Sequence, residues 1–240
     1  MLQYVPPHAR IARLAGAGLF SAFALSACYR AGTITGTVQD AAGKPVAGAA
    51  VVAHWQALGP AIDIQASGSV ATYETRSDAQ GQFRIEAWGP RLHWYGKVDK
   101  VKASVFVFKS GYQGATVVKE SPGNVGYFAN VDIAPQSGTV ELKPASPSQR
   151  ERIENFDLFN VGLRPLLAES PSCPWHRVPA LLGELHRETQ LLLPHSRESG
   201  AWPIMTIDQD LIANADRLAK EAGSSSCPSP KEIFQLQSAP

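Results

Sequence analysis

Short alternating segments separated by turn signals fill residues 33–143, and this pattern is the strongest constraint on the fold. The first segment, 33–38, is followed by Asp40, Gly43 and Pro45. Asp40 can accept backbone N–H groups ahead of it, Gly43 can take a positive φ, and Pro45 prevents further pairing. A hairpin turn is therefore predicted at this point.

Further strands are expected wherever polar and apolar residues alternate again. They are the segments 49–55, 71–76, 82–87, 101–108, 115–118, 127–133 and 139–142. Phe83 and Ile85 share one face, because side chains in a strand repeat every second residue. Seven or eight strands within about 110 residues predict an all-β antiparallel sandwich rather than a parallel sheet.

Four motifs occur in this region in a fixed order. They are GTVQDAAGKPVAGAAVVAHW at 36–55, TRSDAQGQFRI at 75–85, VFVFKSGYQGATV at 105–117 and VELKP at 140–144. Together they resemble the carboxypeptidase regulatory-like domain, a transthyretin-like or prealbumin-like Greek-key β-sandwich of about seven strands. Members of that family are mostly accessory modules fused to carboxypeptidases, envelope receptors or adhesins. The resemblance implies a structural or binding module without catalysis.

The N-terminus has the order of a secretory signal peptide. Arg10 and Arg13 precede an apolar run over 14–24, which ends at Leu25-Ser26-Ala27-Cys28. This run is too short to cross the hydrocarbon core of a membrane, which takes about twenty residues. A cysteine directly after small residues resembles the signal of bacterial lipoproteins.

That resemblance implies diacylglycerol transfer to the Cys28 thiol and cleavage before Cys28. Acyl chains, palmitate among them, would then anchor the mature protein in a membrane. Tyr29 follows Cys28, where lipoproteins retained at the inner membrane carry aspartate. The predicted location is therefore the cell envelope, at the outer membrane and facing the periplasm.

Charge is balanced in the mature chain. Residues 1–27 hold two of the 22 basic residues and none of the 21 acidic ones, which leaves 20 against 21. Nucleic acid is not expected as a partner, because its recognition needs a basic stripe. The expected partners are the membrane, through the N-terminal lipid, and an envelope protein or glycan.

Beyond Pro147 the alternating pattern stops, and helices are expected over 148–155, 175–193 and 206–222. The second and third each carry an apolar stripe. The stripe residues are Leu181, Leu182, Leu185 and Leu192, followed by Ile207, Leu211, Ala215, Leu218 and Ala222. The predicted organisation is a lipoprotein signal peptide (1–27), a carboxypeptidase regulatory-like sandwich (28–145) and a helical C-terminal region (146–240).

Two further cysteines lie in the helical region. Cys173 precedes the second expected helix and Cys227 follows the third, so an antiparallel helical hairpin brings them to the same end. In an oxidising compartment they are predicted to form a disulfide. Closing a loop of about 54 residues would stabilise the fold by roughly 4 kcal/mol. The alternative is a redox or metal pair, for which the sequence offers neither a Cys-x-x-Cys spacing nor neighbouring ligands.

The segment 88–96 departs from the family pattern. It places Trp88, Arg91, His93, Trp94 and Tyr95 among Gly and Pro residues. Aromatic faces supply apolar contact area with little loss of entropy, so these five residues form a candidate binding loop for sugar rings or a partner protein. The alternative is a loop that folds down and caps one end of the sandwich.

Motifs for catalysis, cofactors and metals are missing from the sequence. It contains no Walker loop, dinucleotide fingerprint, Gly-x-Ser-x-Gly frame or His-Glu-x-x-His. We interpret His176, His186 and His195, with Glu184 and Glu188, as solvated helix-face residues. The sequence therefore predicts no catalytic residue, no metal and no cofactor, and a protein that is not an enzyme.

Two functions remain as hypotheses. The first is a membrane-anchored envelope lipoprotein whose sandwich is a non-catalytic binding or structural module. The alternative is a periplasmic hydrolase or carbohydrate-active protein with its site at the 88–96 loop. Its acid–base candidates are His93 and His54, because histidine is the natural proton shuttle near neutral pH. Glu86 and Asp99 are the acidic residues near them in sequence.

Overall fold

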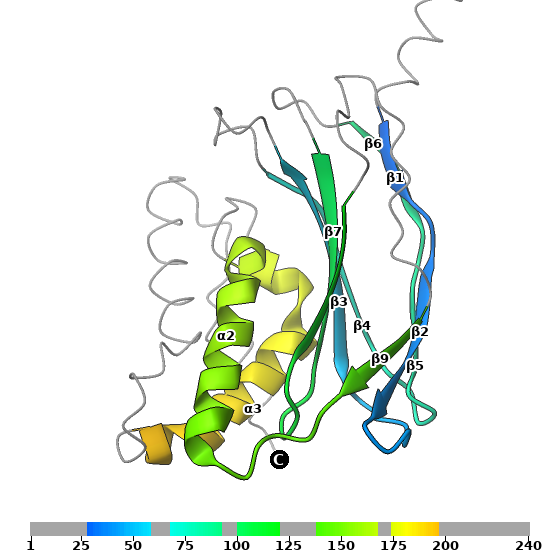
Figure 1. The fold of residues 1–240 in the computed structure, drawn as a ribbon. Helices are drawn as coiled ribbons and strands as arrows, with labels where there is room; N and C mark the ends of the chain where they lie inside the picture. The colour runs from blue at the N-terminus through cyan, green and yellow to red at the C-terminus, as the bar shows by residue number, and fades with distance from the viewer. Residues whose placement is uncertain (1–27, 59–67, 93–99, 121–137, 168–173, 197–240) are drawn as a thin grey trace, which may run out of the picture.

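The computed structural model describes residues 28–58, 68–92, 100–120, 138–167 and 174–196. Within these ranges the chain forms nine strands followed by three helical segments (Figure 1). The strands are β1 (Cys28–Ala31), β2 (Ile34–Asp40), β3 (Ala50–Leu58), β4 (Gly68–Arg76), β5 (Gln82–Ile85), β6 (Trp88–Leu92), β7 (Lys100–Phe108), β8 (Ala115–Glu120) and β9 (Gly138–Leu142). The helical segments are α2 (Gln149–Leu167), the 3-10 helix η3 (Pro174–Arg177) and α3 (Pro179–Ser196).

The strands form a β-sandwich followed by a small helical region, which confirms the predicted fold class. One layer is the antiparallel sheet β4-β3-β7-β8. The other layer is the sheet β5-β2-β9, continued at one end by the ribbon β1-β6 (Figure 1). Strand β9 pairs with β2 in parallel, unlike the antiparallel pairing expected throughout. A parallel pair cannot be closed by a tight hairpin, and six other strands separate these two in sequence.

Apolar side chains of both layers meet between the sheets. From β3 come Val51, Ala53 and Trp55, each almost fully buried. From β5 come Phe83 and Ile85, the two residues predicted to share a face. This core uses the inward half of each alternating segment, because side chains of a strand point to opposite faces in turn.

The predicted turn after the first strand is present. The Oδ1 atom of Asp40 accepts the backbone N–H groups of Ala42 and Lys44, each at 2.9 Å. Gly43 has a φ of +79°, a conformation that glycine adopts without steric cost. The turn at Asp78 repeats this arrangement with the N–H groups two and four residues further on. Both turns follow from side-chain chemistry that the sequence displays.

The central strands of the four-stranded sheet are buried on their outer face as well. Ala50 and Val52 of β3 and Phe106 and Phe108 of β7 pack in one cluster with residues of α2 and α3. Figure 1 shows the two helices covering this face of the sheet. Strands buried on both faces carry nearly continuous apolar runs, as β3 and β7 do. The four-stranded sheet is therefore the middle layer of three.

Helix α2 is longer than the predicted helix at 148–155. Its buried apolar residues recur at Ile153, Phe156, Leu163 and Leu166, so the helix keeps a buried stripe over its whole length. In α3, the four leucines predicted to form one stripe are all fully buried.

Several predicted elements lie outside the described residues. They are the signal peptide 1–27, the strand 127–133 and the helix 206–222. The helices that the structure does describe are too short or too polar to cross a membrane.

Candidate functional site

Cys28, the predicted lipidation residue, is the first residue of strand β1. Strand β1 pairs antiparallel with β6, and the register places Cys28 opposite Leu92 and Tyr29 opposite Arg91. Figure 1 shows this ribbon at one end of the sandwich, beyond the part of the sheet that α2 and α3 cover.

Trp88, the first residue of the candidate binding loop, lies in β6 and is only 7 % exposed. Its ring packs edge-on against Trp55, with 5.3 Å between the ring centroids. Trp55 makes a similar edge contact with Tyr73. Trp88 therefore belongs to the core at this end of the sandwich, which agrees with the alternative of a capping segment and not with an exposed platform at this residue.

Of the other residues of the candidate loop, one lies in a described strand and three lie outside the described residues. Arg91 lies in β6, so this part of the expected loop is a strand. His93, Trp94 and Tyr95 lie outside the described residues, and their role in binding stays a prediction.

His54, the acid–base candidate on β3, is buried within the four-stranded sheet and 3 % exposed. Its Nδ1 atom lies 2.9 Å from the Oγ1 atom of Thr72 on β4. Burial, with a smaller contribution from the charge of Lys102, lowers the pKa of His54 from 6.5 to about 4. An enclosed imidazole that is neutral at pH 7 does not reach an external substrate, which argues against a role in proton transfer.

Glu184 and Glu188 on α3 are not solvated, so that interpretation of the sequence is wrong. They are 3 % and 2 % exposed and bind the turn between β7 and β8. Glu188 accepts the N–H of Gly111 and the hydroxyl of Ser110, both at 2.9 Å. Glu184 accepts the N–H of Ser110 at 3.1 Å. Helical spacing could not reveal these partners, because they come from a turn more than seventy residues earlier.

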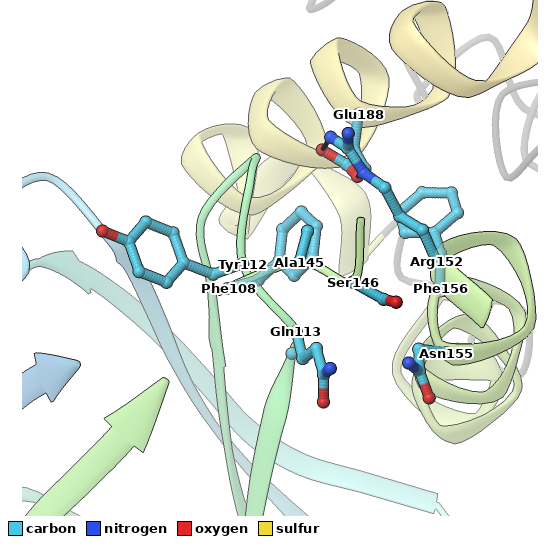
Figure 2. Close-up of a pocket in the computed structure, with 10 residues that line it drawn as sticks. Phe108, Tyr112, Gln113, Ala145, Ser146, Arg152, Asn155, Phe156 and Glu188 are labelled. Atoms are coloured by element: carbon cyan, nitrogen blue, oxygen red, sulfur yellow. Dashed lines mark hydrogen bonds and ion pairs between the residues drawn. The ribbon is translucent and has the colours of Figure 1, made fainter. Parts of the chain in front are cut away.

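Arg152 of α2 completes this cluster (Figure 2). Its Nε atom donates to Oε1 of Glu188 at 2.6 Å and its Nη2 atom donates to Oε2 at 2.9 Å. Burial alone would raise the pKa of Glu188, but the hydrogen bonds from Arg152, Gly111 and Ser110 outweigh it and lower the pKa below its ordinary value. One carboxylate thus joins α2, α3 and the β7–β8 turn.

A cavity of about 10 Å³ lies beside this ion pair, lined in part by Phe108, Gln113 and Asn155 (Figure 2). A space of this size holds about one water molecule. It is therefore too small for a substrate.

Glu74 of β4 binds the N-terminus of α3. Its two carboxylate oxygens accept the N–H groups of Ala180 at 2.8 Å and Leu181 at 2.7 Å. Burial raises the pKa of Glu74 from 4.5 to about 7, although these N–H groups and the charge of Arg76 favour the ionised form. The contact fixes the start of the helix against the edge of the sheet.

The outer face of the sheet β5-β2-β9 carries a group of polar side chains. The register places Thr35 beside Arg84, and Thr37 beside both Gln82 and Thr139. Cross-strand partners share one face of a sheet. These five residues, which we call the polar face, form part of the lining of an open hollow of about 770 Å³, which also reaches Thr75 and Arg76 of β4 and Asp78 of the turn that follows. Their hydroxyl, amide and guanidinium groups can donate and accept hydrogen bonds from a polar surface.

The polar face was not predicted from the sequence. The only sequence signal for it is the set of polar residues that alternate with apolar ones, Thr35 and Thr37 in β2 and Gln82 and Arg84 in β5. That pattern indicates a solvated face of a sheet and says nothing of a hollow, because the curvature of the sheet is set by its pairing.

The predicted disulfide cannot be placed in the fold, since Cys173 and Cys227 lie outside the described residues. Their pairing stays a prediction. Within the described ranges, no three His, Cys, Asp or Glu side chains come close enough together to hold a metal ion.

Comparison with protein-family models and with curated proteins gives no match. Among solved structures, the chain is similar to catechol 1,2-dioxygenase from Pseudomonas arvilla C-1, with 19 % identity, a TM-score of 0.28, and coverage of 48 % of this chain and 53 % of that one. It is similar to 3-chlorocatechol 1,2-dioxygenase from Rhodococcus opacus 1CP, with 17 % identity, a TM-score of 0.26, and coverage of 46 % and 57 %. It is also similar to an alternative pilotin of the Vibrio cholerae type II secretion system, with 14 % identity, a TM-score of 0.23, and coverage of 47 % and 93 %.

The aligned part of this chain spans just over half the length of these two dioxygenases. At such identities and TM-scores, no substrate or partner is transferred from these structures to this chain.

Four of the matched structures are catechol dioxygenases, which are enzymes. This finding contradicts the prediction that the chain is not an enzyme. The prediction depended on the absence of known sequence motifs. A β-sandwich can bring together residues that lie far apart in sequence, and no short motif reveals such a site.

Proposed function

We propose that this protein is an envelope lipoprotein, anchored by lipid at Cys28 in the outer membrane, whose sandwich binds an envelope protein through the polar face. The observation that carries the proposal is the order of residues at the N-terminus, where Arg10 and Arg13 and an apolar run over 14–24 precede Leu25-Ser26-Ala27-Cys28. The resemblance to accessory sandwich domains supports the same proposal.

The shape and chemistry of the polar face favour a protein over a glycan as its partner. The hollow is open and extends across all three strands of its sheet, from Arg84 on β5 to Thr139 on β9. A partner must therefore bring a broad surface rather than a single ring. Interfaces between proteins that also exist apart are about as polar as the remaining protein surface, which fits these side chains.

Membrane fractionation and palmitate labelling test the anchor. The wild-type protein is expected in the membrane fraction and to remain there after washing with high salt. The Cys28→Ala variant is expected to take up no labelled palmitate, because it lacks the acceptor of the lipid. Labelled palmitate in Cys28→Ala, or none in the wild-type protein, contradicts the proposed anchor.

Site-specific crosslinking in intact envelopes tests the polar face. A photoreactive amino acid at Thr37 is expected to give a defined protein adduct. The same group at Gln190, an exposed residue of α3, serves as the control and is expected to give none. Adding Arg84→Glu should abolish the adduct at Thr37, because it breaks the ion pair of Arg84 with Glu86 (2.6 Å) and places two carboxylates side by side at the edge of the face. Equal adducts at both positions, insensitivity to Arg84→Glu, or adducts with glycan would contradict a protein partner at this face.

A further inference from the structure

We infer that the ribbon β1-β6 lies against the bilayer, so that an anionic lipid surface is the partner of this end of the sandwich. This inference rests on the proposed lipidation of Cys28. It adds an orientation: the ribbon faces the membrane, and the turn after β2 faces away from it.

The proposed anchor lies within the described fold, with no spacer between them. Cys28 is a member of β1 and is paired with Leu92 in β6. A flexible linker would let the domain move away from its lipid. Here the acylated residue is held by backbone pairing, and Arg30 follows within about 7 Å of chain length. The ribbon must therefore remain at the level of the headgroups.

The ribbon carries basic residues and no acidic one. Its two strands, Cys28–Ala31 and Trp88–Leu92, contain Arg30 and Arg91 and no acidic residue. The Arg30 side chain is exposed. A basic residue beside an anionic lipid surface is attracted to it.

The orientation of the sandwich on the membrane follows from the distance between the ribbon and the opposite end of its layer. Figure 1 shows β1 leading into β2, which runs along the sandwich away from the ribbon. Seven residues of strand span roughly 20 Å. The turn that follows contains Lys44, whose side chain is exposed. Arg30 and Lys44 are thus two basic surface positions at opposite ends of one layer.

These two positions allow a direct test. Arg30→Trp and Lys44→Trp are each introduced into the full chain, and the lipid-bearing proteins are reconstituted into vesicles of phosphatidylethanolamine, phosphatidylglycerol and a brominated phosphatidylcholine. Bromine quenches tryptophan fluorescence only at short range. The fluorescence added at position 30 is expected to be strongly quenched and that added at position 44 to be unaffected, relative to the wild-type protein.

Tyr29→Trp provides a second reporter in the ribbon, which keeps both arginines and covers the case in which Arg30→Trp does not fold. Mass spectrometry first establishes that each protein carries lipid, and a protein without lipid refutes the proposed anchor itself. Equal quenching at the two ends, or no quenching at positions 29 and 30 in lipid-bearing protein, overturns the orientation and leaves the anchor standing.

Discussion

Arg152 and Glu188 form a two-point ion pair that fastens helix α2 to helix α3, with nitrogen–oxygen distances of 2.6 Å and 2.9 Å. The Glu188 side chain is 2 % exposed and that of Arg152 is 20 % exposed. The same carboxylate also binds the β7–β8 turn through Ser110 and Gly111. The helical layer therefore depends on a polar contact as well as on its apolar stripe.

Arg152→Ala should lower the free energy of unfolding by about 3–5 kcal/mol, because it leaves the Glu188 carboxylate buried without its cation. Denaturation by urea, followed by circular dichroism, measures the loss. Arg150→Ala is the matched control, since Arg150 lies on the same helix in an exposed pair with Glu154. A loss no larger for Arg152→Ala than for this control would show that the buried pair does not hold the helices.

Two glycines give opposite predictions for the same substitution. A Cβ atom at Gly114 would clash with the ring of Phe159, which packs against Phe108. Gly114→Ala should therefore cost about 1–3 kcal/mol of stability through overpacking. Gly162 lies within α2, and apart from the backbone of its own helix no atom lies within 4 Å of the place that a Cβ would occupy there, so Gly162→Ala should stabilise by about 0.5–1 kcal/mol. Thermal unfolding of both variants tests this, and a shift of the same sign in both would contradict the packing described.

His54 should remain neutral in the folded protein until the pH approaches 4. Its folded pKa of about 4 lies below the ordinary 6.5, so the unfolded state binds its proton more readily. The stability that depends on neutral His54 is present above pH 6.5 and is lost as the pH falls toward 4. Titration of the His54 ring by NMR measures the pKa directly, and a value at or above 6 would contradict the burial of this side chain.

Glu74 should lower the stability of the folded protein as the pH rises, which is opposite to the effect of His54. Its folded pKa of about 7 exceeds the ordinary 4.5, so the folded state holds the proton more tightly. Its contribution is present below pH 4.5 and is lost as the pH rises through 7. Relative to wild type, Glu74→Gln should therefore gain about 1–3 kcal/mol between pH 5 and pH 8. A difference between the two proteins that is the same at both pH values would exclude this role for Glu74.

Local chemistry made much of the sandwich predictable. The Asp40 turn, the shared face of Phe83 and Ile85, and the leucine stripe of α3 all follow from residue types and their spacing. These features depend on neighbours within a few positions of each other in the chain. Sequence patterns report such contacts well.

Contacts between distant segments could not be predicted in this way. The pairing of β9 with β2, the burial of Glu184 and Glu188, and the place of Trp88 in the core all depend on partners far away in sequence. One signal was available in the apolar character of both faces of β3 and β7, which indicates a second covering layer. The polar face offered only the ordinary alternation of a solvated sheet.

The mass of the N-terminal peptide decides whether Cys28 carries lipid. The protein is purified from membranes, digested, and its first peptide is measured beside that of Cys28→Ser produced in the same cells. The proposal predicts that the wild-type chain begins at Cys28 with a diacylglyceryl group on its sulfur, whereas Cys28→Ser carries no lipid and retains residues 1–27. A wild-type chain whose Cys28 thiol is unmodified would contradict the proposed anchor and the membrane orientation that depends on it.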